Sequence, residues 1–218
     1  MKKSLMAMAV ALCTVSLAHA GNTGFYLGGQ LGRGLLVLDS KSAKHGDFQG
    51  RVDTKSNALA GSVNLGYNFK PQFDVPIRTE LSFTARGNAK YSAKVSAMYY
   101  DLTLSLKHKV RTLMLNNYYD IYTGGNFTPY VSLGIGYAFI NSSTKILDDE
   151  GGMSKSTYSD KSFAYSFGLG TSYKITDNWS VNTMVRATYD GTFKSTIPSN
   201  ISVKSTTYDL MFGVLYNF

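Results

Sequence analysis

Six charged residues stand at alternate positions within segments that otherwise alternate large apolar with small or polar side chains. They are Arg78, Glu80, Arg86, Asp120, Arg186 and Asp209. If these segments are strands that close around a narrow lumen, the charges on the inward face must be paired or hydrated. They would then form either a gate or selectivity filter, or a structural plug. Spacing predicts two ion pairs between neighbouring segments, Arg78 with Asp120 and Arg186 with Asp209. If the charges are a plug, Arg186→Leu should reduce stability rather than flux.

Residues that could support catalysis or metal binding are few. His45 and His108 are the only histidines after residue 20, and both fall in segments that read as polar outer regions. Ser105 lies three residues from His108, which puts the two on opposite faces of a strand. No G-x-S-x-G or H-E-x-x-H motif occurs, and Asp148-Asp149-Glu150 lacks EF-hand spacing, which is typical of a solvated loop. The sequence predicts no enzyme, no cofactor and no bound metal.

The first 20 residues predict a secretory signal peptide. Lys2 and Lys3 precede an apolar run, and Ala18-His19-Ala20 is a suitable cleavage site. Cys13 follows Leu12, which is too large for the position before a lipidated cysteine. Processing would leave residues 21–218 as one domain without cysteine, and would lower the formal net charge from +8 to +6.

The stretch from Tyr208 to Phe218 alternates with a period of two. Its large face is Tyr208, Leu210, Phe212, Val214, Tyr216 and Phe218. This pattern resembles the closing strand of a bacterial outer-membrane barrel, whose terminal aromatic residues the assembly machinery reads. Tyr216 and Phe218 are therefore the expected assembly signal. The alternative is an edge strand of a soluble sandwich, which would need a second sheet to cover this face.

The same alternation predicts eight strands in all. Their approximate ranges are 24–36, 58–69, 77–86, 113–121, 131–139, 163–173, 179–189 and 208–218. Long connections follow the odd-numbered strands, and the expected surface loops are Val37–Asn57, Gly87–Lys109, Asn141–Asp160 and Asp190–Lys204. Asn117 interrupts an apolar face, so a bulge is possible there.

The two faces of these strands favour a membrane barrel over a soluble sandwich. Large residues share one face, whereas Gly, Ser and Asn share the other, as expected when lipid lies outside and a narrow lumen inside. The sequence therefore predicts an all-β, eight-stranded antiparallel transmembrane β-barrel with short periplasmic turns and four long extracellular loops. Aromatic residues near the short-turn ends predict an interfacial girdle: Phe25, Tyr67, Phe69, Tyr119, Tyr173, Trp179, Tyr216 and Phe218.

Positive charge is concentrated in the second outer region. The residues are Lys90, Lys94, Lys107 and Lys109, against one Asp101. This basic patch could meet the phosphates of the outer leaflet or bind an acidic host ligand. A nucleic-acid partner is not expected, because a base-stacking platform needs aromatic residues among the basic ones on one open face.

Two segments, Ile77 to Tyr91 and Leu113 to Ala138, resemble the opacity-protein family of surface barrels. The second contains Asn-Asn-Tyr-Tyr-Asp-Ile and then Thr-Pro-Tyr-Val-Ser-Leu-Gly-Ile-Gly-Tyr-Ala. The resemblance covers the whole barrel and implies a porin-like family whose members act as adhesins that bind host-cell receptors through variable loops.

These observations predict a protein of the outer membrane of a Gram-negative bacterium, exposed at the cell surface. Its expected function is adhesion to host or environmental ligands; the alternatives are porin activity and a structural role in the envelope. The expected partners are outer-membrane lipid and lipopolysaccharide, the barrel-assembly machinery and a host-cell receptor or surface ligand.

Overall fold

The computed structural model describes residues 23–40, 51–52, 55–97, 100–147, 153–195 and 201–218. Its strands are β1 (Phe25–Ser40), β2 (Arg51–Val52), β3 (Lys55–Asn68), β4 (Ile77–Arg86), β5 (Ala89–Ala97), β6 (Tyr100–Asp120), β7 (Phe127–Leu147), β8 (Met153–Lys174), β9 (Trp179–Ser195) and β10 (Ile201–Asn217), with one short helix, α2 (Lys70–Phe73). Within these ranges, no helix is long and apolar enough to cross a membrane.

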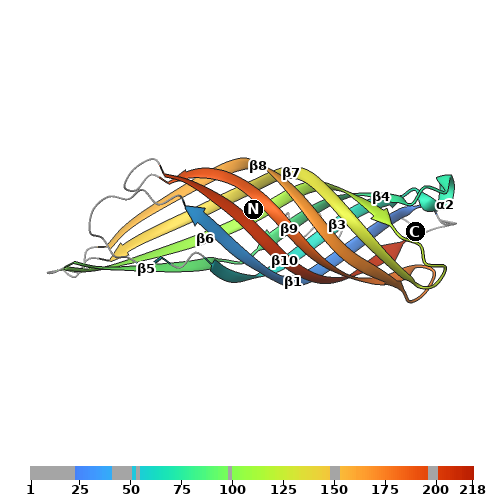
Figure 1. Ribbon diagram of the computed structural model, residues 1–218, viewed down its shortest axis with the longest axis horizontal. Coiled ribbons are helices and arrows are strands. Elements are labelled where there is room, and N and C mark those ends of the chain that lie inside the picture. The colour runs from blue at the N-terminus through green and yellow to red at the C-terminus, as the bar shows by residue number, and fades with distance from the viewer. Residues whose placement is uncertain (1–22, 41–50, 53–54, 98–99, 148–152, 196–200) are drawn as a thin grey trace, which may run out of the picture.

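Eight strands close into an antiparallel barrel. The ring runs β6-β4-β3-β1-β10-β9-β8-β7 and returns to β6. β5 follows β4 after a two-residue break and pairs with the outer half of β6, while β2 pairs with β5. The strands are inclined to the long axis of the molecule, as closure of a barrel requires (Figure 1). The predicted fold class is confirmed.

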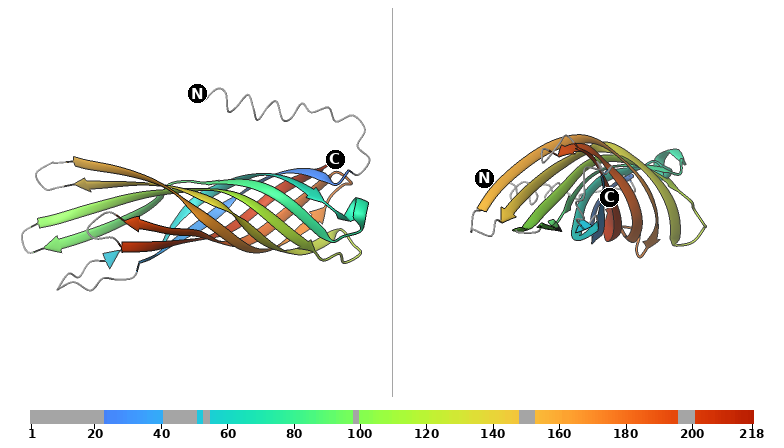
Figure 2. Two further views of the ribbon diagram at one scale, coloured as in Figure 1. Left: turned by 90° about the horizontal axis from the view of Figure 1, so that it is seen from above. Right: turned by 60° about the vertical axis from the view of Figure 1, so that its left-hand side comes forward.

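Two hairpins extend well beyond the rest of the barrel. Pairing continues to Ala97↔Tyr100 in β5–β6 and to Leu147↔Met153 in β7–β8. Figure 2 shows both hairpins reaching farther than β9 and β10 at the same end. The segment predicted as the loop Gly87–Lys109 is therefore largely a strand hairpin, in keeping with the alternation of residues 98–106 in the sequence.

The other three predicted loops include residues that belong to the neighbouring strands. Within the expected ranges, β1 continues to Ser40, β7 to Leu147 and β9 to Ser195. Polar residues can extend a strand here because β-pairing needs only the backbone. The acidic segment Asp148–Glu150 and His45 lie outside the described residues.

Short connections and aromatic residues mark the opposite end. α2 occupies part of the connection between β3 and β4, and Asp74 ends it with a φ of 57°. In the β8–β9 turn, the Lys174 ammonium donates a hydrogen bond to Asp177, which lowers the pKa of that carboxyl.

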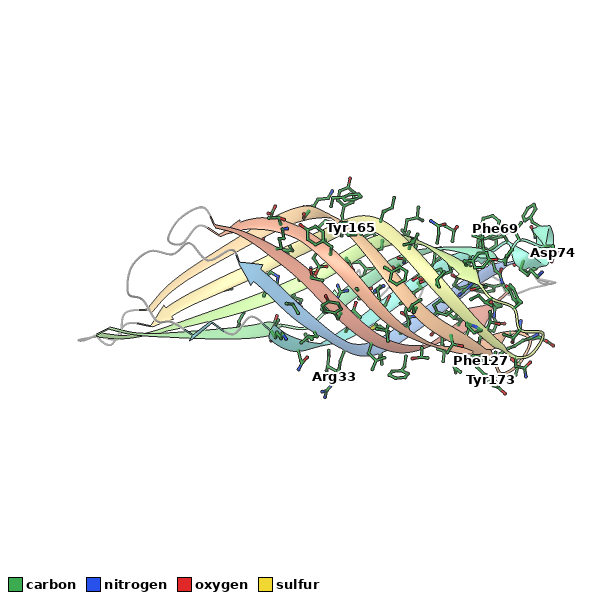
Figure 3. The ribbon with its side chains drawn as sticks, viewed as in Figure 1. Arg33, Phe69, Asp74, Phe127, Tyr165 and Tyr173 are labelled. Atoms are coloured by element: carbon green, nitrogen blue, oxygen red, sulfur yellow. The ribbon has the colours of Figure 1, made fainter. Side chains whose placement is uncertain are left out.

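The predicted girdle forms near this end. Its ring pairs, 4.8 to 5.1 Å between centroids, are Phe25–Tyr67, Tyr67–Phe69, Trp179–Tyr216 and Tyr216–Phe218. Figure 3 shows Phe69, Phe127 and Tyr173 close to the short-turn end, with Arg33 projecting from the outer wall farther along the barrel.

The outer wall carries large apolar side chains, and the lumen carries small, polar and charged ones. Leu31 is 74% exposed and Phe212 is 58% exposed, whereas Arg86 is 1% exposed. So much exposed apolar surface is expected only where lipid covers it. Asn117 also faces outward, and its Oδ1 accepts a hydrogen bond from Thr79 Oγ1 at 2.8 Å. β6 keeps an unbroken register with both neighbours there, so no bulge is needed.

Candidate functional site

The lumen near the short turns is filled by an arginine held among aromatic rings. Arg78 on β4 donates from Nε and Nη2 to the two carboxylate oxygens of Asp120 on β6, at 2.6 and 2.9 Å. The rings of Tyr26, Tyr118 and Tyr130 lie 4.7 to 5.6 Å from its guanidinium carbon. These contacts satisfy the buried cation by a bidentate ion pair and by cation–π attraction.

Glu80 lies beside this arginine and forms no salt bridge within the part of the chain that the structure describes. Instead its Oε2 accepts a hydrogen bond from Tyr26 Oη at 3.1 Å, and its Oε1 accepts one from Tyr118 Oη at 2.8 Å. Tyr26 comes from β1 and Glu80 from β4, with β3 between them in the ring. The hydrogen bond therefore joins two strands that are not neighbours in the sheet. We call these six residues, Tyr26, Arg78, Glu80, Tyr118, Asp120 and Tyr130, the lower tier.

Glycine makes room for the lower tier. A Cβ on Gly66 would collide with the ring of Tyr26, and one on Gly170 would lie 2.5 Å from Tyr130 Oη. Tyr130 Oη donates to the backbone oxygen of Thr183 at 3.2 Å, which connects β7 to β9. The tyrosines that point into the lumen therefore fit only because glycines lie opposite their rings.

A second group of charges lies toward the long hairpins. Arg86 on β4 donates from Nε and Nη2 to Asp209 on β10, at 3.0 and 2.5 Å. Arg186 on β9 donates from Nη2 to the same carboxylate at 3.1 Å and to Thr84 Oγ1 at 3.2 Å. We call Thr84, Arg86, Arg186 and Asp209 the upper tier. Since β3 and β1 separate β4 from β10, the Arg86–Asp209 pair crosses the lumen.

The lumen also contains apolar side chains, most of them toward the long hairpins. Its buried cluster consists of Leu36, Ala58, Ala89, Val110, Met114, Ala138, Ile140 and Ala164. His108 and Asp190 are buried at this end, each with no measurable exposure. Thr207 Oγ1 and Ser205 Oγ donate to Asp190 Oδ2, at 2.5 and 3.4 Å.

Sequence reasoning missed several of these residues. His108 was placed in a polar outer region and is in fact buried, because alternation continues unbroken from Asp120 back to His108 along β6. That continuation was the available signal. Asp190 had been assigned to a loop; it sits instead where the β9–β10 register skips one residue, beside Gly191 with a φ of 103°. Nothing in the sequence pattern indicates this bulge.

All six predicted lumen charges are buried inside the barrel. The structure contains both expected ion pairs, Arg78–Asp120 and Arg186–Asp209. The sequence did not predict that Asp209 would also take Arg86 from the opposite wall. Contacts between strands that are not neighbours thus occur in both tiers, inside a lumen that is narrow in an eight-stranded barrel.

The outer surface above the apolar wall carries a belt of basic residues. We call it the basic belt, and its members are Arg33, Lys55, Lys107, Lys109, Arg111, Lys161 and Lys204. Lys109 is half-buried and the others are exposed. Of the predicted basic patch, Lys107 and Lys109 belong to this belt. The backbone pairs Lys90 with Lys107 and Lys94 with Thr103, but the side chains of Lys90 and Lys94 lie outside the described part of the structure.

A family of known proteins matches almost the whole chain. Residues 4–218 match the model of the outer membrane protein beta-barrel domain. This chain belongs to that family. It is located in the outer membrane of a Gram-negative bacterium, as the sequence predicted.

Two known bacterial proteins are similar to this chain along most of their length. The chain is 28% identical to outer membrane protein PagN of Salmonella typhimurium over 236 aligned positions, which cover 95% of this chain and 98% of PagN. It is 27% identical to a candidate adhesin of Rickettsia bellii, over 80% of this chain and 78% of that protein.

Solved outer-membrane barrels share the fold. Neisserial surface protein A covers 91% of this chain and is itself covered completely, with a TM-score of 0.53 and 18% identity. A major outer membrane protein from Thermus thermophilus covers 92%, with a TM-score of 0.53 and 14% identity. Together with the closed strand ring, these barrels establish the architecture as that of small outer-membrane proteins.

Proposed function

We propose that the protein is an adhesin that attaches the cell to a host or environmental surface. The observation that carries this proposal is the projection of the β5–β6 and β7–β8 hairpins beyond the barrel (Figure 2). Paired strands hold these hairpins in extended form, so they can present a fixed surface away from the membrane. The similarity to candidate Rickettsia adhesins supports the same function.

A role in passive solute passage is disfavoured by the lumen. Both tiers contain direct hydrogen bonds between strands that are not neighbours, and in the upper tier one of them joins β9 to β4 on the opposite side of the ring. An enzymatic role is also disfavoured. The buried charges of both tiers are tied to one another rather than arranged around an open site.

Three partners complete the proposal. A host-cell receptor or surface ligand would contact the hairpins. Lipopolysaccharide would contact the basic belt, since cations above an apolar wall face the phosphates of the outer leaflet. The barrel-assembly machinery would engage β10 through Tyr216 and Phe218, whose rings lie 5.1 Å apart.

Hairpin truncation tests the adhesin proposal. One variant replaces residues 144–156 by Asn-Gly, which shortens β7–β8 at the Ser143↔Thr157 pair. A second replaces residues 91–106 by Asn-Gly, at the Lys90↔Lys107 pair of β5–β6. The matched control replaces residues 195–201 by Asn-Gly, at the Lys194↔Ser202 pair of β9–β10.

Adhesion of cells that display each variant is then compared with that of cells displaying the full barrel. We expect loss of binding with either hairpin variant and retention with the control. A folded barrel resists unfolding in detergent unless it is heated, so its unheated and heated samples migrate differently on a gel. This difference verifies that each variant is assembled. Equal binding by all assembled variants would exclude the hairpins as the adhesive surface.

A further inference from the structure

A groove of about 500 Å³ opens on the outer wall, where β4, β6, β7 and β8 lie side by side. Its lining residues are Phe83, Arg111, Phe139, Ile140, Asn141, Ser159, Asp160 and Lys161. Neither the plugged lumen nor the projecting hairpins account for it.

Two cations flank an aromatic residue in this groove. Arg111 pairs with Phe139 across β6 and β7, and Phe139 pairs with Lys161 across β7 and β8. The three side chains therefore form one row on the outward face. Because neighbouring strands lie about 4.8 Å apart, the Cα atoms of Arg111 and Lys161 are about 10 Å apart. On the other side of Arg111 the row continues with Ala85, whose small side chain leaves space above Phe83.

Both cations are available to an anion. Arg111 is exposed and has no ion pair within the described part of the chain. Lys161 Nζ lies 4.0 Å from the centroid of the Tyr137 ring and 5.7 Å from that of Phe139, so aromatic faces position its charge without neutralising it. Asp160 also lines the groove, and its Oδ1 accepts the backbone N–H of Lys161 at 2.8 Å. The groove thus keeps a net positive charge.

The row lies where the outer wall changes from apolar to polar. The adjacent outward positions toward the short turns are Leu113, Tyr137 and Phe163, all large and exposed. Those toward the hairpins are Lys109, Asn141 and Ser159. From Val131 to Phe139, β7 provides nine residues, which is the length that a tilted strand needs to cross the hydrocarbon layer. The groove is therefore at the level of the lipid headgroups in the outer leaflet.

We propose that this groove binds the phosphorylated headgroup of lipopolysaccharide, with phosphate held by Arg111 and Lys161 and the adjoining acyl chains against Phe83 and Phe139. Because the two cations come from strands whose Cα atoms are about 10 Å apart, they suit a headgroup with two phosphates better than a phospholipid with one. The site rests on the lipopolysaccharide contact proposed above and is independent of adhesion.

The test is native mass spectrometry of the refolded full barrel, titrated with bisphosphorylated lipid A in detergent. The variant is R111A/K161A. The matched control is K55A/K204A, which removes two exposed cations of the basic belt from β3 and β10, on either side of β1. We expect at least about tenfold weaker binding for R111A/K161A, because two charge-assisted contacts are lost, and a clearly smaller loss, of about twofold, for K55A/K204A, whose cations add only to the general attraction of the belt.

Further measurements with other lipids and variants show which part of the lipid and of the groove is responsible for binding. Lipid A without its phosphates and phosphatidylglycerol should each bind the unchanged barrel about tenfold more weakly than bisphosphorylated lipid A. The D160N variant should bind at least as tightly as the unchanged barrel. R111Q/K161Q repeats the test should the alanine variant fail to refold.

Each contrary result has a distinct meaning. If the unchanged barrel does not bind lipid A, the lipopolysaccharide contact itself is wrong. If it binds but R111A/K161A and K55A/K204A weaken lipid A binding equally, the basic belt attracts lipid A as a whole and the groove is not a specific site. The proposal would also be overturned if the unchanged barrel bound phosphatidylglycerol, or lipid A without its phosphates, as tightly as it binds bisphosphorylated lipid A.

Discussion

Arg86 and Asp209 meet across the lumen, although they belong to β4 and β10, with β3 and β1 between them in the ring. Nη2 lies 2.5 Å from Oδ2, Nε lies 3.0 Å from Oδ1, and both side chains are fully buried. Arg186 shares the same carboxylate at 3.1 Å. One aspartate thus serves two buried cations from different walls.

Asp209→Asn should strongly destabilise the barrel. The substitution leaves Arg86 and Arg186 buried without an anionic partner, which costs about 3–5 kcal/mol in free energy of unfolding. The measurement is urea unfolding of the refolded barrel in lipid vesicles, followed by Trp179 fluorescence. Asp177→Asn is the control: it breaks an exposed pair with Lys174 and should leave the free energy of unfolding unchanged. Similar unfolding curves for the two variants would contradict the plug.

The barrel should give a flat trace in a planar bilayer under applied voltage. The lower and upper tiers block the lumen at two heights, so neither ions nor small solutes have an open path. Arg186→Leu should reduce the free energy of unfolding and leave the trace flat, because the lower tier remains intact. Reproducible single-channel steps from the unchanged protein would put solute passage ahead of adhesion.

Phe218→Ala should slow assembly in the outer membrane of living cells more than it slows refolding into vesicles. The backbone N–H of Phe218 donates to Phe25 O at 3.0 Å, and its carbonyl accepts from Thr23 N at 3.0 Å; alanine keeps both bonds. Only the ring is lost, and with it the contact to Tyr216. Pulse-labelled cells, sampled for the folded form on gels, provide the measurement. Equal slowing in cells and in vesicles would assign the ring to stability alone.

Alternation was sufficient to predict the barrel and the direction of its charges. Because a strand sends successive side chains to opposite faces, Arg78 and Asp120 could be placed inside from the sequence alone. The pairing of adjacent strands could also be predicted, so the two ion pairs between neighbouring strands, Arg78–Asp120 and Arg186–Asp209, were expected. The Arg86–Asp209 pair was not, because it depends on the shear that brings non-adjacent strands face to face across the lumen.

The ends of the strands were harder to predict. Polar sequence around Lys90 and Lys107 reads as a loop, yet these residues pair in the β5–β6 hairpin. Above the membrane both faces of a strand meet water, so the apolar face that reveals a strand is absent. His108 was misplaced for a different reason: the predicted strand began at residue 113, whereas the alternation along β6 continues back to His108 inside the barrel.

Gly170→Ala should destabilise the barrel, whereas Gly29→Ala should not. A Cβ on Gly170 would lie 2.5 Å from Tyr130 Oη, so the ring must move away from its hydrogen bond to Thr183 O and from the Arg78 guanidinium. Overpacking of this kind costs about 1–3 kcal/mol. Gly29 faces outward, and a Cβ there meets no atom within 4 Å. Urea unfolding of the two variants side by side makes the comparison. If Gly170→Ala unfolds at the same urea concentration as Gly29→Ala, then Tyr130 can move freely and the lower tier is not the rigid packing that the structure describes.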